Sequence, residues 1–151
     1  MKRLLKFGSL LSFAIMIFSF QSDGNCDTRA LKEKAKKSLD PYKYDVAKVT
    51  RVVYKDMPSS KEIEVPLFIG EKYRLLFNTE ALPRKIVVNL YNRDKDNKRR
   101  KLLFSSKDQE GDKSEFTFDY SFATKIFLDY EIPAGDSVVK GGCMVFMMGY
   151  K

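Results

Sequence analysis

Apolar and polar residues alternate with a period of two along most of the chain after residue 41. The alternation defines eight short segments, at 44–55, 63–69, 73–77, 85–91, 102–104, 116–118, 126–130 and 141–150. A period of two is typical of β-strands, and the connections are rich in Gly, Pro, Asn, Asp and Ser. The pattern therefore predicts an all-β fold, a single antiparallel β-sandwich of the jelly-roll type with about eight strands.

One helical pattern precedes these segments. Between residues 27 and 39, apolar side chains recur at near-helical spacing among basic ones, at Ala30, Leu31, Ala35 and Leu39. Asp27 or Thr28 can cap the start of this helix, and Pro41 ends it. Its apolar face has no aromatic residue, so we expect a short helix that lies on the domain rather than on a membrane.

The first 21 residues have a different character. Lys2, Arg3 and Lys6 precede an apolar run over residues 7–20, and no acidic residue occurs among the first 21. A basic segment followed by an apolar one of this length is typical of a secretory signal peptide. As a helix the run would be about 21 Å long, shorter than the hydrocarbon core of about 30 Å, which disfavours a membrane anchor.

We therefore expect three regions: a signal peptide at 1–21, an N-terminal segment with the short helix at 22–41, and the β-sandwich domain at 42–151. The protein is expected to be exported, either periplasmic or extracellular and at the cell surface, with no transmembrane segment in the mature chain. A lipid anchor on Cys26 is a weaker alternative. The preceding Asp23-Gly24-Asn25 is not the run of small residues that a lipoprotein signal has.

The charge balance changes when the signal peptide is set aside. The whole chain has 28 basic and 20 acidic residues and a formal charge of +8. Three basic residues lie in the first 21, so the mature chain has 25 basic and 20 acidic residues and a charge of +5. This mild excess fits contact with anionic envelope surfaces and gives no ground for a nucleic-acid partner.

The chain contains no His and only two Cys. It therefore lacks the commonest general base and transition-metal ligand, and it cannot assemble the Cys-rich sets that hold zinc or iron–sulfur clusters. We expect no cofactor and no enzymatic activity.

The two cysteines, Cys26 and Cys143, lie near the two ends of the mature chain. In an oxidising compartment we expect them to form a disulfide. A free, buried Cys143 beside an exposed Cys26 is the alternative.

Two segments are apolar on both faces, residues 86–91 and 143–148. An antiparallel sheet with one solvated face alternates more cleanly, so something covers the second face of these strands. The short helix, held there by a Cys26–Cys143 bridge, is one explanation. A partner protein or an apolar ligand is the other, and the interaction surface would then comprise Val87, Met144, Phe146 and Met148.

The strongest local charge feature is the basic run Lys98-Arg99-Arg100-Lys101, in the connection between two predicted strands. It can be a solvated hairpin tip. The alternative, less favoured by the sequence, is contact with phosphate or carboxylate groups of envelope glycans or lipids, or with an acidic protein.

Two groups of acidic residues suggest other chemistry. Asp108, Glu110 and Asp112 could converge on one calcium ion, although flanking lysines favour a solvated turn. Asp129 and Glu131 share one strand face, and hydrolysis by a carboxylate pair needs no His.

From residue 63 onward the segments VPLFIGEKYRLLFNTE, KIVVNLYN, KLLFSSKD and GGCMVFMMGYK follow one another. This arrangement resembles a group of uncharacterised exported bacterial proteins of similar size, over most of the mature chain. More distantly, it is similar to the non-catalytic accessory β-sandwiches of secreted peptidases. Both resemblances imply a binding or structural module, and neither implies a ligand or catalytic residues.

We therefore expect an exported, non-enzymatic binding or structural module of the bacterial cell envelope, with an envelope protein or glycan as its partner. A hydrolase of envelope glycans that uses a carboxylate pair is one alternative. A calcium-dependent adhesion-type module is the other.

Overall fold

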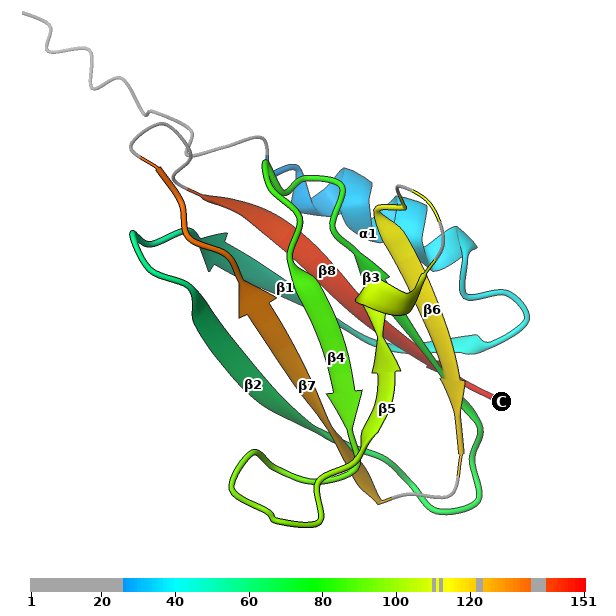
Figure 1. Ribbon diagram of the computed structural model, residues 1–151. Helices are drawn as coiled ribbons and strands as arrows, with labels where there is room; N and C mark the ends of the chain where they lie inside the picture. Colours follow the sequence, from blue (N-terminus) through cyan, green and yellow to red (C-terminus); the bar gives the residue numbers. More distant parts are fainter. Residues whose placement is uncertain (1–25, 110, 112, 122–123, 137–140) are drawn as a thin grey trace, which may run out of the picture.

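The structure is a computed structural model that describes residues 26–109, 111, 113–121, 124–136 and 141–151 (Figure 1). The expected signal peptide at 1–21 lies outside the described residues. In the part of the chain that is described, no helix has the length and hydrophobicity needed to cross a membrane.

Within the described residues, one short helix is followed by eight strands. The helix α1 spans Thr28–Lys37, and the strands are β1 (Lys43–Val53), β2 (Ser59–Pro66), β3 (Tyr73–Asn78), β4 (Val87–Tyr91), β5 (Leu102–Ser105), β6 (Glu115–Tyr120), β7 (Lys125–Ile132) and β8 (Gly141–Tyr150). One 3-10 turn, η1 (Ser106–Asp108), follows β5. The helix and every strand lie at the segments that the residue pattern predicts, with ends that differ by a few residues.

The strands form two four-stranded antiparallel sheets. Sheet A has the order β1-β8-β3-β6 and sheet B the order β2-β7-β4-β5. The first strand pairs with the last, β2 with β7, β3 with β6, and β4 with β5, as when one long hairpin is rolled up. This is the strand order of a jelly roll, so the predicted all-β sandwich is confirmed. Successive strands run in opposite directions, which places the β2–β3 and β4–β5 loops at the same end of the sandwich (Figure 1).

The main core lies between the two sheets. Apolar side chains from both sheets meet there, among them Val52, Val65, Leu75, Phe77, Val88, Leu90, Phe104, Ile126, Leu128 and Tyr130. Phe77 stacks on Phe146 of the same sheet, with ring centroids 5.3 Å apart, and on Phe104 of the opposite sheet, at 6.5 Å. Because side chains alternate between the faces of a strand, every second residue of the predicted pattern enters this core.

The interaction surface expected from the sequence is wrong for three of its four residues. Met144, Phe146 and Met148 are only 0%, 3% and 4% exposed, and they pack in the core between the sheets. β8 is a central strand of sheet A, so these residues face sheet B rather than solvent. Val87 of β4 is half-buried and does not belong to that core cluster.

The other face of β8 is covered by α1. Leu31, Ala35 and Leu39 from the helical region form a second buried cluster with residues of sheet A, namely Leu76, Cys143, Val145 and Met147. The helix therefore covers the second apolar face of residues 143–148, which confirms the helix explanation for this segment. An apolar ligand is not needed there. No residue of 86–91, a segment that the structure describes in full, belongs to the cluster beneath the helix, so the helix does not explain the second face of that segment.

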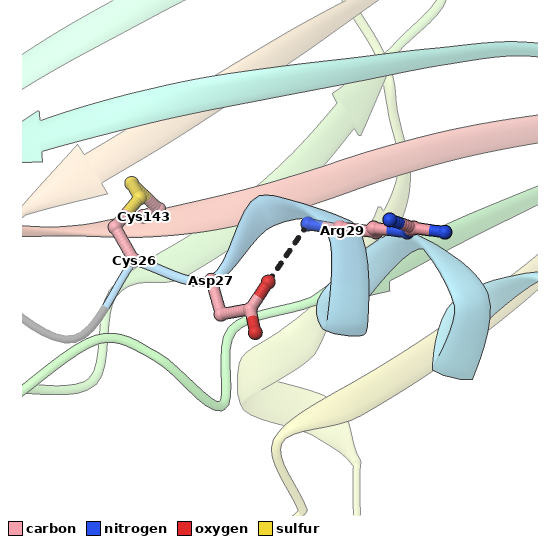
Figure 2. The surroundings of a disulfide bond; sticks show 4 residues. All are labelled: Cys26, Asp27, Arg29 and Cys143. Carbon is pink, nitrogen blue, oxygen red and sulfur yellow. Dashed lines mark hydrogen bonds between the residues drawn. A yellow bond between two sulfur atoms is a disulfide. The ribbon is translucent and has the colours of Figure 1, made fainter.

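The N-terminal end of α1 is fixed to sheet A by a disulfide. Cys26, two residues before the helix, is bonded to Cys143 of β8, with a Cα–Cα distance of 5.5 Å (Figure 2). Asp27 caps the helix, because its carboxylate accepts hydrogen bonds from the backbone N–H groups of Arg29 and Ala30 at 3.1 and 3.0 Å. The predicted disulfide is confirmed.

The turn after α1 is fixed by an arginine of sheet A. Arg74 of β3 donates to the backbone oxygen of Asp40 at 2.8 Å and makes two hydrogen bonds, of 2.7 and 2.8 Å, to the carboxylate of Asp119 on β6. Tyr42 stacks on the guanidinium at 4.5 Å and donates to the same carboxylate at 3.0 Å. The helical segment is thus held to the sheet at both ends.

Removing the disulfide tests the first of these attachments. The bridge joins residues 117 apart, and the chain-entropy model gives a contribution of about 4–5 kcal/mol for so large a loop. We expect the variant Cys26→Ala/Cys143→Ala to lose about 2–5 kcal/mol of unfolding free energy in urea titrations. Reduced wild-type protein is the matched control and should lose a similar amount. An unchanged unfolding free energy in both samples would show that the bridge is not a structural attachment.

Acid should weaken the second attachment. The Arg74 guanidinium holds the pKa of the Asp119 carboxyl below its ordinary value of 3.8, so the pair stabilises the fold above that pH and is lost as the pH falls through the lowered pKa. The Asp119 side chain is 46% exposed, so solvent screening limits the effect to about 1 kcal/mol or less. We expect wild type to exceed Asp119→Asn in stability by a constant margin above pH 5 or so. Urea titrations at lower pH should show that margin shrinking, and a margin independent of pH would contradict this assignment.

Candidate binding surface

The predicted basic run lies in the β4–β5 loop, residues 92–101, and the structure divides it. Lys98, Arg99 and Lys101 are exposed, whereas Arg100 is half-buried against the outer face of sheet B. Backbone hydrogen bonds give this loop a defined shape: the N–H of Asn97 donates to Asp94 O at 3.2 Å, and the N–H of Arg100 donates to Asn97 O at 3.0 Å. The three exposed cations therefore project from an ordered loop.

Arg100 anchors the loop to sheet B. Its Nη2 atom lies 2.8 Å from a carboxylate oxygen of Glu62 on β2 and 3.4 Å from one of Asp129 on β7. The guanidinium also lies 3.5 Å from the ring centroid of Tyr91. All three charged side chains are less than one-fifth exposed. Arg100 is therefore occupied by structural contacts, and its inclusion in the predicted contact surface is wrong.

The loop keeps a large positive excess without Arg100. Residues 92–101 contain six basic and two acidic residues. The other five basic side chains are exposed and have no ion-pair partner among the described residues: Arg93, Lys95, Lys98, Arg99 and Lys101. Such a loop is an electrostatic site for an anion or an anionic surface.

Beside this loop, the β2–β3 loop (residues 67–72) carries the two most exposed large apolar side chains of the described residues. Phe68 is 78% exposed and Ile69 is 80% exposed. The base of the loop is firmly held, since the N–H of Leu67 donates to Thr124 O at 2.8 Å and the N–H of Phe68 donates to the hydroxyl of buried Tyr73 at 3.0 Å. The apolar tip is therefore presented by an anchored loop rather than by a frayed one.

The sequence pattern placed Ile69 in a strand, as the last apolar position of 63–69. The strand ends at Pro66, which has no N–H to continue the ladder, and Gly70 with φ +95° turns the chain. The two signals, a proline inside the alternating run and a glycine at its end, mark residues 67–70 as a loop. In the sequence Pro66 hints at an edge strand or a break, but the alternation continues to Ile69 and so includes it in the predicted strand.

The two loops share a cleft with a volume of about 610 Å³. Ile69 lines it from the β2–β3 loop, Asn92 and Arg93 line it from the β4–β5 loop, and Lys125 and Phe127 line it from β7. Lys125 pairs with Glu64 at 3.2 Å, at the outer edge of the cleft. The cleft thus joins apolar walls to cationic groups. We call the β2–β3 loop, the β4–β5 loop and Lys125 together the loop end.

The predicted acidic sites receive little support. Asp108 is exposed in η1, and Glu110 and Asp112 lie outside the described residues. In the described part of the chain, no group of three or more potential metal ligands of the Cys, Asp and Glu type is brought together. Asp129 shares the Arg100 guanidinium, and Glu131 pairs with Lys107 at 3.1 Å, so both strand-face carboxylates are in ion pairs.

Comparison of the chain with protein families, with curated proteins and with solved structures finds no match. The geometry of the loop end is therefore the basis on which a function is proposed.

Replacing Arg100 and its neighbour Arg99 by alanine, one at a time, distinguishes the anchoring role of Arg100 from the loss of an exposed charge. Arg100→Ala leaves the half-buried carboxylates of Glu62 and Asp129 without their cation, so we expect a loss of about 1–3 kcal/mol of unfolding free energy in urea. The matched control Arg99→Ala removes an exposed charge and should change stability by about 0.5 kcal/mol or less. Equal losses in the two variants would show that Arg100 does not anchor the loop.

Proposed function

We propose that the protein is an exported, non-enzymatic binding module of the cell envelope, and that the loop end is its contact surface. The observation that carries this proposal is the exposure of Phe68 and Ile69 on an anchored loop beside five exposed cations. Burying two such side chains is worth about 1.5–3 kcal/mol each. A complex in which a partner covers both side chains is stabilised by this free energy, whereas in the isolated domain both remain in water.

Two features support export. The N-terminal sequence has the basic and apolar segments of a signal peptide. The Cys26–Cys143 disulfide persists in oxidising compartments, whereas cytosolic thiols are kept reduced. An envelope location also brings the loop end close to anionic surfaces, which match its charge.

The contacts of the acidic residues favour binding over carboxylate-pair hydrolysis. The two carboxylates of such a hydrolase flank the scissile bond and must be free to contact the substrate. Glu62 and Asp129 instead share one arginine, and Glu131 and Glu64 each pair with a lysine.

Co-sedimentation with washed cell envelopes tests the proposal. We expect the wild-type protein to bind saturably, because such envelopes contain every surface component of the cell. The variants Phe68→Ser/Ile69→Ser and Lys98→Glu/Arg99→Glu should each weaken binding by about tenfold or more, since each removes one half of the contact surface.

Matched controls lie elsewhere on the domain. Met57, which is 75% exposed in the β1–β2 loop, serves for the apolar change as Met57→Ser, and Lys32→Glu/Lys55→Glu reverses two exposed charges outside the loop end. These controls should bind like wild type. Absence of saturable binding, or equal loss in all the variants, would contradict the proposed surface.

A further inference from the structure

We infer that the loop end docks on an anionic phospholipid surface, with Phe68 and Ile69 inserted among the acyl chains and the cations of the β4–β5 loop on the headgroups. This inference rests on the proposed function, because it names the partner of the same surface. Three features of the loop end support it: the distribution of apolar and charged groups, the cleft between the two loops, and the size of the apolar patch.

The apolar and the charged groups of the loop end lie on different loops, which suits binding at a bilayer interface. Phe68 and Ile69 are adjacent in sequence and occupy one loop, and the cations occupy the neighbouring one. Amphipathic elements bind an interface when apolar groups reach the acyl boundary and basic groups meet anionic lipids. Lysine and arginine stems can follow the apolar groups toward the interface while their charges stay at headgroup level.

The cleft between the loops suits a phosphate-bearing headgroup. Arg93 supplies a positive charge that is unpaired among the described residues, and Lys125 supplies a second cation, which is paired with Glu64. Asn92 supplies an amide, and Ile69 supplies an apolar wall. Its volume of about 610 Å³ lies in the range of small-molecule sites. Asp94 also lines the cleft, so recognition depends on the net positive charge of the loop rather than on a purely cationic pocket.

The size of the apolar patch favours a membrane over a protein partner. A stable protein interface buries about 800 Å² on each side, with an apolar core and few lysines. Here two side chains form the apolar part, and Lys95, Lys98 and Lys101 are exposed on the neighbouring β4–β5 loop. Insertion into a bilayer needs only a small apolar group, provided that charges add to the attraction. A nucleic acid would pair with the cations but leave the apolar tip in water.

Vesicle co-sedimentation tests the inference. The probes are vesicles of phosphatidylcholine alone and of phosphatidylcholine mixed with phosphatidylglycerol. Wild type and every variant carry the same N-terminal residues, so that differences in binding come from the substituted positions. We expect the wild-type protein to bind the anionic vesicles at least about tenfold more tightly, and less tightly as salt rises. Phe68→Ser/Ile69→Ser and Lys98→Glu/Arg99→Glu should each reduce this binding by about tenfold or more, and Met57→Ser should not.

Fluorescence gives an independent readout, because the chain contains no tryptophan. In the Phe68→Trp variant, the emission maximum of the single tryptophan should shift to shorter wavelength when anionic vesicles are added. Brominated acyl chains should quench this emission. Met57→Trp, in the β1–β2 loop, should show neither effect.

The outcomes distinguish the inference from the proposal on which it rests. Saturable binding to cell envelopes without binding to anionic vesicles would overturn the lipid inference and leave the binding module standing, with a protein or glycan as its partner. Vesicle binding that is equal for wild type and both loop-end variants would also overturn it, because another part of the chain would then be responsible. If the wild-type protein binds neither cell envelopes nor anionic vesicles, the proposed function is overturned as well.

Discussion

The burial of β8 on both faces is the constraint on which the rest of the structure depends. Residues 142–149 of this central strand are all buried, one face against sheet B and the other against α1. A jelly roll alone covers only the inner face of each sheet, so the outer face of β8 would expose Val145 and Met147 without the helix. The disulfide and the contacts of Arg74 keep the helix over the outer face of β8, because each holds one end of the helical segment to sheet A.

The same constraint explains why Phe68 and Ile69 stand out. Most of the apolar residues of the strands and of α1 pack in one of two cores, between the sheets or beneath the helix. The residues of the β2–β3 tip belong to neither, although Leu67 and Tyr73 on either side of them are buried. Phe68 and Ile69 are the two most exposed large apolar side chains of the described residues, and they are adjacent in sequence, which makes the pair a candidate contact surface.

The residue pattern predicted the strands well because each has a core face with a period of two. It could not say which faces of β8 meet which layer, since Cys143–Met148 is apolar at every position. Strand order decides that question, and strand order depends on pairing between residues far apart, such as Arg51 with Cys143. Met144, Phe146 and Met148 were therefore assigned to a surface that proves to be core.

The basic loop shows the same limit at the level of one residue. Nothing in Lys98-Arg99-Arg100-Lys101 distinguishes Arg100 from its neighbours, because its partners Glu62 and Asp129 come together only through the pairing of β2 with β7. The disulfide was predictable, in contrast, since two cysteines allow only one intramolecular pairing.

The jelly-roll connectivity also places the β2–β3 and β4–β5 loops at one end of the sandwich and the disulfide at the other. Strands run in alternate directions, so the β2–β3 and β4–β5 loops share one end, whereas β8 begins at the opposite end, where Cys143 meets Cys26 (Figures 1 and 2). The disulfide therefore lies at the end of the sandwich away from the apolar tip, whereas the Arg74 attachment of the helical segment lies in β3, close to the β2–β3 loop. A surface that covers the loop end leaves the disulfide free of contact. The disulfide and the two cores close the fold without a partner at that end.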